Sequence, residues 1–219
     1  KRKIKSVVMA SSDKVYGNYP KSKMPYRESY ELKAKFPYDV SKACADIIAQ
    51  SYSSNLYKLP IVITRFSNIY GPGQMNFSAL IPDSIISAMG YSKFNPRGDG
   101  NHTRDFLYVG DVVDLYLTIS KNLFKKPELL RGQIFNAGSN KPYKIRDIIK
   151  LIFKKENKNK NFQKILNKFK SKKTIGEIDH QYMDYKKEKK YFGWTPKHSF
   201  EKGIEETINW YKKYINYIN

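Results

Sequence analysis

Two short apolar runs enclose a stretch of helical periodicity near the start of the chain, and this order constrains the fold more than any other feature. Residues 5–10 and 59–66 are rich in β-branched side chains and lead into polar residues, as buried strands of a parallel sheet do. Between them, residues 38–56 repeat apolar side chains at helical spacing and follow Pro37, a residue that suits the first turn of a helix. This alternation of strand and helix predicts an α/β layered domain.

The rest of the chain continues the alternation less regularly. Glycine and proline predict a loop over residues 67–73. Residues 154–173 are rich in lysine and asparagine with apolar side chains at helical spacing, and we interpret them as a solvated amphipathic helix. The other predicted helices cover residues 79–89, 111–121, 145–154 and 201–217, and the other predicted strands cover residues 103–109 and 133–136.

The composition is that of a chain with a packed core and no cross-links. Hydrophobic residues make up 40% and aromatic residues 15% of the 219 residues, so disorder is not expected. The single cysteine, Cys44, excludes an internal disulfide, and three scattered histidines lack the spacing of a zinc site. Nothing resembles a signal peptide, and no apolar run approaches ~18 residues. The sequence therefore predicts a soluble, cytoplasmic protein that does not enter a membrane.

The formal net charge of +21 raises the question of nucleic-acid binding. Only seven of the 41 basic residues are arginine, and lysine occurs together with abundant asparagine, isoleucine and tyrosine, a pattern typical of AT-rich coding sequences. No recognised nucleic-acid-binding module is found. A basic binding domain without catalysis remains an alternative, but nucleic acid is not the favoured partner, and the same charge suits an anionic small molecule.

Five polar side chains in two motifs predict a site that moves protons. Tyr38 and Lys42 are four residues apart in the predicted helix, so they lie on one face, one turn apart. A lysine beside a tyrosine stabilises the phenolate, so a group with an ordinary pKa of about 10 can act as a base near neutrality. Ser12, Asp13 and Lys14 add a hydroxyl, a carboxylate and a second ammonium directly after the first predicted strand.

One motif of dinucleotide-binding domains does not occur in the sequence. Neither G-x-G-x-x-G nor G-x-x-G-x-x-G is found, so these 219 residues do not contain the turn that holds a pyrophosphate. Because Lys1 stands directly before a predicted strand, we expect the chain to be the later part of a longer protein.

Seven sequence landmarks occur in an order that resembles one known family. The chain resembles the extended short-chain dehydrogenases/reductases, within them the NAD-dependent nucleotide-sugar 4,6-dehydratases and epimerases. The landmarks are S-S-D-K-V-Y-G (11–17), Y-D-V-S-K (38–42), R-F-S-N-I-Y-G-P-G (65–73), L-I-P (80–82), R-D-F-L-Y-V-G-D-V-V (104–113), F-N-A-G (135–138) and F-G-W-T-P (192–196).

The resemblance implies an architecture, a cofactor and an assembly. Residues 1–75 would be the remaining catalytic part of a Rossmann-type parallel sheet, with residues 103–140 partly returning to it. Residues 76–219 would form mainly a smaller α/β substrate-binding part and C-terminal helices. The cofactor would be NAD or NADP, the substrate a nucleotide-diphosphate sugar, and the full-length protein a homodimer. The isolated chain is expected neither to hold NAD tightly nor to turn over.

The resemblance also implies catalytic roles. Tyr38 would take the proton of the sugar C4 hydroxyl, Lys42 would hold the nicotinamide ribose and keep Tyr38 acidic, and Ser12 would hydrogen-bond the C4 oxygen. Asp13 would be the acid that loses its proton to the leaving C6 hydroxyl. Lys14 would either take the C5 proton as a neutral amine or stabilise the enolate electrostatically.

Further contacts follow from the same resemblance. Cofactor contacts are expected from Ser11, Tyr38, Lys42, Phe66 and Ile69, and substrate contacts from Ser12, Asn68, Leu80, Arg97, Arg104 and Asn140. Arg104 would reach the phosphates, which suits a guanidinium. Asp105 would brace its loop and Trp194 would serve packing, whereas for Asp179, Gln181 and Tyr182 a substrate-side and a plain loop position remain equally open.

Asp13 and Lys14 favour a dehydratase over a 4-epimerase. Epimerisation at C4 needs only the serine, tyrosine and lysine, whereas loss of water across C5–C6 also needs an acid and a base. The S-D-K order matches the CDP-glucose 4,6-dehydratase type, but residues 97–105 are closer to general epimerases and dehydratases. The nucleotide therefore stays open, and a nucleotide-sugar 4-epimerase is the alternative function.

Overall fold

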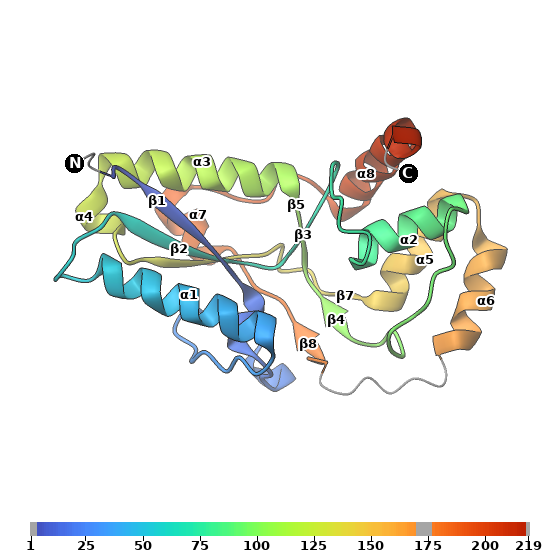
Figure 1. The fold of residues 1–219 in the computed structure, drawn as a ribbon, viewed down its shortest axis with the longest axis horizontal. Coiled ribbons are helices and arrows are strands. Elements are labelled where there is room, and N and C mark those ends of the chain that lie inside the picture. Colours follow the sequence, from blue (N-terminus) through green and yellow to red (C-terminus); the bar gives the residue numbers. More distant parts are fainter. Residues whose placement is uncertain (1–3, 170–176, 218–219) are drawn as a thin grey trace.

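A three-stranded parallel sheet forms the centre of the first half of the fold (Figure 1). The computed structural model describes residues 4–169 and 177–217. Strands β1 (Val7–Ser12), β2 (Ile61–Phe66) and β6 (Ile134–Ala137) lie in the order β1-β2-β6. Helix α1 (Pro37–Ser53) joins β1 to β2, as the apolar periodicity predicts.

Alternate side chains of β2 pack on opposite faces of this sheet, which explains why the strand is apolar throughout. Ile61 and Ile63 form a cluster with Ala49 of α1. Val62 packs in another cluster with Leu115 of α3 (Val109–Lys125). The two helices therefore cover the two faces, and the α/β prediction is confirmed.

A second cluster of helices and very short strands follows the sheet. Strand β3 (Asn68–Tyr70) pairs in parallel with β5 (Phe106–Tyr108), and β4 (Thr103–Arg104) lies between β7 (Tyr143–Lys144) and β8 (His180–Gln181). The helices of this part are α2 (Leu80–Met89), α5 (Ile145–Lys155), α6 (Asn159–Phe169) and α8 (Phe200–Tyr214). The remaining short elements are α4 (Pro127–Leu130), α7 (Lys186–Phe192) and the 3₁₀ turns Asp13–Tyr16, Lys21–Lys23 and Ile215–Tyr217.

Three predictions for single segments need correction. The predicted loop over residues 67–73 contains strand β3, which pairs with β5 before the chain turns at Gly71. The predicted strand over residues 103–109 breaks into β4 and β5 at Asp105, whose buried carboxylate accepts hydrogen bonds from another loop. Helix α6 is not simply solvated, because three of its apolar side chains are buried in the core of this part; residues 170–173 of that prediction lie outside the described residues.

Within the described ranges, no helix is both long enough and apolar enough to cross a membrane.

Candidate active site

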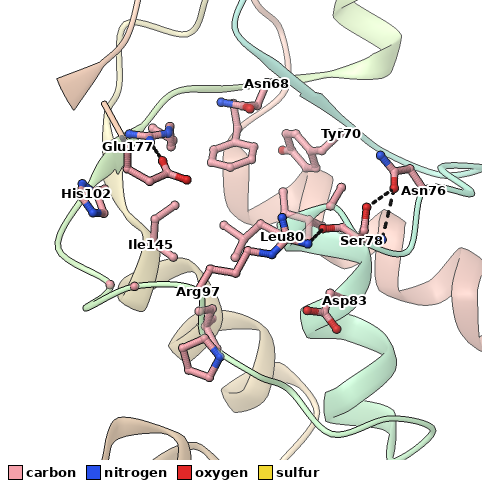
Figure 2. Close-up of a pocket in the computed structure, with 18 of the residues that line it drawn as sticks. Asn68, Tyr70, Asn76, Ser78, Leu80, Asp83, Arg97, His102, Ile145 and Glu177 are labelled. Carbon is pink, nitrogen blue, oxygen red and sulfur yellow. Dashed lines mark hydrogen bonds and ion pairs between the residues drawn. The ribbon is translucent and has the colours of Figure 1, made fainter. Parts of the chain in front are cut away.

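A cavity of about 760 Å³ lies between the end of the parallel sheet and the helices of the second cluster. Figure 2 shows Glu177 and His102 on one side of it and Asp83 of α2 on another, with Asn68 and Tyr70 along β3. Seven predicted site residues line this cavity: Lys14, Tyr38, Asn68, Ile69, Leu80, Arg97 and Arg104. The fold thus places residues that are far apart in the sequence around one cavity.

Tyr38 and Lys42 lie together on the first turns of α1. Pro37 begins the helix, which sets Tyr38 at the cavity wall with 55% of its surface exposed. Lys42 Nζ lies 6.0 Å from the centroid of the Tyr38 ring and donates to the carbonyl of Ala10 at 3.4 Å. The predicted juxtaposition of phenol and ammonium on one face is therefore present.

The pKa of Tyr38 shifts in the direction opposite to the expected one. Burial raises it, the hydroxyl of Ser12 acts to lower it, and the carboxylates of Asp13 and Asp39 raise it further. Burial is the largest of these effects, and Lys42, whose Nζ lies 6.0 Å from the ring centroid, does not offset it.

Ser12 and Asp13 form a short polar chain behind the cavity wall. Ser12 caps the 3₁₀ turn that follows β1, accepting from the amide of Lys14 at 3.3 Å and donating to Asp13 Oδ1 at 3.2 Å. Asp13 is 2% exposed, and within the described part of the chain its Oδ2 has no hydrogen-bond partner. Burial raises the pKa of Asp13, while the charges of Lys14 and Arg104 oppose that shift. The carboxyl group is thus held toward its protonated form.

Arg104 brings a buried guanidinium to the cavity. It is 7% exposed and donates to the carbonyl of Ile178 at 2.6 Å and to that of Thr103 at 2.9 Å. Its Nη2 forms an ion pair with Glu177, which also lines the cavity (Figure 2).

Two further predicted substrate residues are tied to backbone carbonyls. Asn68 Nδ2 donates to the carbonyl of Asp105 at 3.1 Å. Arg97 is exposed and donates from Nη2 to the carbonyl of Ser78 at 3.0 Å. Each side chain is thereby oriented beside the cavity.

Residues 1–207 match the family model described as GDP-mannose 4,6 dehydratase. The chain belongs to this family. The resemblance read from the seven motifs is confirmed.

Similar proteins of known name and structure are consistent with membership of this dehydratase family. The human dTDP-D-glucose 4,6-dehydratase is 34% identical over 216 residues, which are 96% of this chain and 57% of that protein. The crystal structure of dTDP-glucose 4,6-dehydratase from Bacillus anthracis in complex with NAD has a TM-score of 0.80 and 31% identity, covering 97% of this chain and 63% of that one. The dTDP-glucose 4,6-dehydratase from Streptomyces venezuelae, 24% identical with a TM-score of 0.81, shares the fold; it covers 97% of this chain and 61% of that one. The chain therefore spans less than two thirds of the length of these relatives.

Several predicted contact residues of this dehydratase-family chain do not line the cavity. Ser11 is buried and donates to Asp46 Oδ2 at 2.7 Å, and Phe66 packs in the core against Tyr116 with ring centroids 5.1 Å apart. Asn140 is exposed with a left-handed φ of 57° and lies outside the cavity wall. Ser12, Asp13 and Lys42 lie close to the wall residues without being part of the wall.

The predicted bracing residue, Asp105, joins three segments. Its fully buried carboxylate accepts from the amide of Ser139 at 3.0 Å and from the amide of Met183 at 3.3 Å. A Cβ atom at Gly138 would lie 2.2 Å from Asp105 Oδ2, so glycine is needed for this approach. Burial raises the pKa of Asp105 to about 7, against the opposing hydrogen bonds from Ser139 and Met183.

Asp179, Gln181 and Tyr182, whose roles the sequence left open, make contacts within the protein or are buried in it. Trp194 is buried in the hydrophobic cluster around β2, as its predicted packing role requires. Asp179 pairs with His102 at 3.3 Å, and the carbonyl of Tyr182 accepts from the amide of Tyr26 at 3.1 Å. Gln181 is fully buried, and its side-chain amide has no hydrogen-bond partner among the described residues.

The sequence reasoning missed Asp83, His102 and Glu177 in the cavity wall. Asp83 directly follows the L-I-P motif and could have been noticed there. Glu177 follows a lysine-rich stretch, and no motif marks it.

Proposed function

We propose that the protein containing these residues is a nucleotide-sugar 4,6-dehydratase. The observation that carries the proposal is Asp13, a buried carboxyl with a raised pKa directly behind the wall that Lys14 and Tyr38 form. C4 oxidation alone has no use for such an acid, whereas elimination of water across C5–C6 requires one.

Two groups of residues transfer protons in the proposed reaction, one at C4 of the sugar and one at C5 and C6. At C4, Tyr38 as phenolate removes the hydroxyl proton while Ser12 hydrogen-bonds the oxygen. At C6, Asp13 gives its proton to the departing hydroxyl, which leaves as water. Lys14, as a neutral amine, takes the C5 proton and, as the ammonium so formed, stabilises the enolate; once water has left, C6 would accept a hydride and C5 would take its proton back from Lys14. The reaction thus needs Tyr38 deprotonated and Asp13 protonated at the same pH.

Tyr38 and Lys42 fit the nicotinamide-ribose end of NAD, because the phenol and the ammonium share one face of α1 beside the cavity. NAD, when bound, takes up the hydride from C4 and returns it to C6. A pyrophosphate-binding glycine turn is not part of this sequence.

Three further predictions are kept as proposals. The exposed apolar side chains of α1, among them Ile47, Ile48 and Tyr52, support the homodimer. Separate hydrophobic clusters around β2 and around α2 support a division into two parts, with Trp194 joining the β2 cluster and Tyr70 the α2 cluster. The free, exposed Cys44 fits a reducing compartment such as the cytoplasm.

Product analysis tests the proposed function. The protein that contains these 219 residues is incubated with NAD and candidate sugar nucleotides. We expect a 4-keto-6-deoxy sugar nucleotide, detected by its ultraviolet absorbance in alkali and by mass spectrometry as the loss of one water. A C4-inverted sugar of unchanged mass would instead establish the 4-epimerase, and the proposal would then fail.

A further inference from the structure

The carboxylate of Asp83 lines the cavity but has no role in the reaction proposed at C4, C5 and C6. Asp83 lies in the first turn of α2 and is half-buried in the cavity wall (Figure 2). Within the described part of the chain, no hydrogen bond or ion pair reaches its carboxylate oxygens. First-turn aspartates of two other helices are engaged: Asp111 accepts from His198, and Asp147 lies 3.9 Å from Arg146.

A cation accompanies this carboxylate. Arg97 lines the same cavity as Asp83 (Figure 2), and its charge opposes the upward shift that burial gives the pKa of Asp83. Arg97 donates one hydrogen bond from Nη2 to the carbonyl of Ser78. A guanidinium has five N–H donors in all, so others are left to bind a ligand. An acceptor and a set of donors therefore line one cavity, together with the apolar side chains of Leu80 and Pro96.

This pattern of acceptor beside donor distinguishes between nucleobases. Cytosine, adenine and guanine carry an exocyclic amine on the Watson–Crick edge next to an acceptor or a second donor, and a carboxylate accepts from such an amine. Uracil and thymine show one N–H between two carbonyl oxygens, so a carboxylate facing that edge also meets a carbonyl. Guanidinium donors complement the acceptor atoms of the amino-bearing bases.

We propose that Asp83 selects a nucleotide whose base carries an exocyclic amine, with Arg97 donating to an acceptor atom of that base. This inference rests on the proposed function, because it places the nucleotide end of the substrate in the same cavity. The proposed class includes the guanine nucleotide in the name of the family model and excludes the thymidine nucleotides in the names of the relatives described above.

Binding of free nucleoside diphosphates tests this assignment without any need for turnover. Dissociation constants for CDP, GDP, ADP, UDP and dTDP are measured by isothermal titration calorimetry on the protein that contains these 219 residues. At least one amino-bearing diphosphate is expected to bind about tenfold more tightly than UDP and dTDP. The variant Asp83→Asn, whose amide can both accept and donate, should bind both groups of bases equally.

The matched control is Asp147→Asn, which changes a first-turn aspartate of α5 outside the cavity and should keep the wild-type ranking. Tighter binding of UDP or dTDP by the wild type, or an unchanged ranking in Asp83→Asn, would overturn the role of Asp83. If none of the five diphosphates binds at millimolar concentration, the nucleotide-sugar function itself fails, and that outcome is distinct from a wrong ranking. The wild-type ranking still tests the predicted class of base if the variant folds poorly.

Discussion

At the scale of single residues, the guanidinium of Arg104 provides a positive charge that could bind a diphosphate. This guanidinium already forms an ion pair with a carboxylate of the same chain. Its Nη2 pairs with Glu177, whose side chain is 42% exposed. A diphosphate that reaches Arg104 must therefore displace or share this partner. The variant Glu177→Gln is expected to bind nucleoside diphosphates about fivefold more tightly, which corresponds to about 1 kcal/mol for a partly exposed ion pair.

Calorimetric titration with a nucleoside diphosphate measures this change. Glu128→Gln removes a similar exposed pair, with Arg131 at 3.0 Å, outside the cavity and should leave the affinity unchanged. Weaker binding in Glu177→Gln would show that Glu177 organises Arg104 for the phosphates instead of competing with them.

Glu188 of α7 makes stability depend on pH. It is fully buried, and both of its carboxylate oxygens have no hydrogen-bond partner among the described residues. Burial raises its pKa well above the ordinary value, and the charges of Glu28 and Asp184 add to this shift. The folded state thus binds the proton more tightly than the unfolded state, so the free energy of unfolding falls as pH rises above about 4.3, by at most about 1.4 kcal/mol per pH unit.

The variant Glu188→Gln should remove this loss. Its gain in the free energy of unfolding over the wild type, measured by urea denaturation, should be larger at pH 8 than at pH 5. Glu205→Gln, at an exposed pair with Lys155, should show no such difference. An equal effect of Glu188→Gln at both pH values would contradict the assigned titration.

At the scale of elements, a buried ion pair fixes the catalytic helix to the sheet. Asp46 of α1 and Arg65 of β2 are 0% and 2% exposed and meet at 2.8 Å. Burial acts to raise the pKa of Asp46, but the hydrogen bonds and charge of Arg65 bring it below its ordinary value. Ser11 at the end of β1 also donates to Asp46, so three elements share this contact.

The variant Asp46→Ala leaves Arg65 buried without its partner. We expect it to lower the free energy of unfolding by about 3–5 kcal/mol, as the loss of one member of a buried pair does. Chemical denaturation followed by circular dichroism measures the change. Asp147→Ala, at an exposed position, should cost less than about 0.5 kcal/mol. A loss of similar size in both variants would mean that the buried pair does not hold α1 in place.

Periodicity predicted the long elements and the four-residue strand β6, but it missed the two-residue strands β7 and β8. Strands β1 and β2 and helices α1, α2 and α5 were found because each repeats apolar residues over six or more positions. Strands β7 and β8 have two residues each, too few to show any alternation, and their pairing depends on contacts with β4.

The site was predictable only where a motif marks it. Tyr38 and Lys42 are related by one helical turn, so their juxtaposition follows from local spacing. Glu177 meets Arg104 across 73 positions of sequence, a contact that only the tertiary fold creates. The predicted direction of the Tyr38 pKa shift was wrong for a similar reason, because the burial of Tyr38 and its proximity to Asp13 arise from the tertiary fold.

At the scale of the whole molecule, β1 is the edge strand of its sheet within the described residues, and the sequence contains no glycine-rich phosphate turn. The 219-residue chain by itself is therefore expected to bind NAD only weakly, because Tyr38 and Lys42 reach one end of the dinucleotide alone. Titration calorimetry and mass spectrometry of the purified chain check this expectation. Stoichiometric NAD that survives purification would contradict it.

The central claim is that Asp13 makes this site a dehydratase, and Asp13→Asn tests it most directly. The variant of the protein that contains these residues is mixed with NAD and its sugar nucleotide. The absorbance of reduced nicotinamide and the mass of the product are followed together. The account predicts that C4 oxidation still produces reduced nicotinamide, whereas formation of the 4-keto-6-deoxy product falls by about 100-fold or more. Undiminished dehydration in Asp13→Asn would contradict the account.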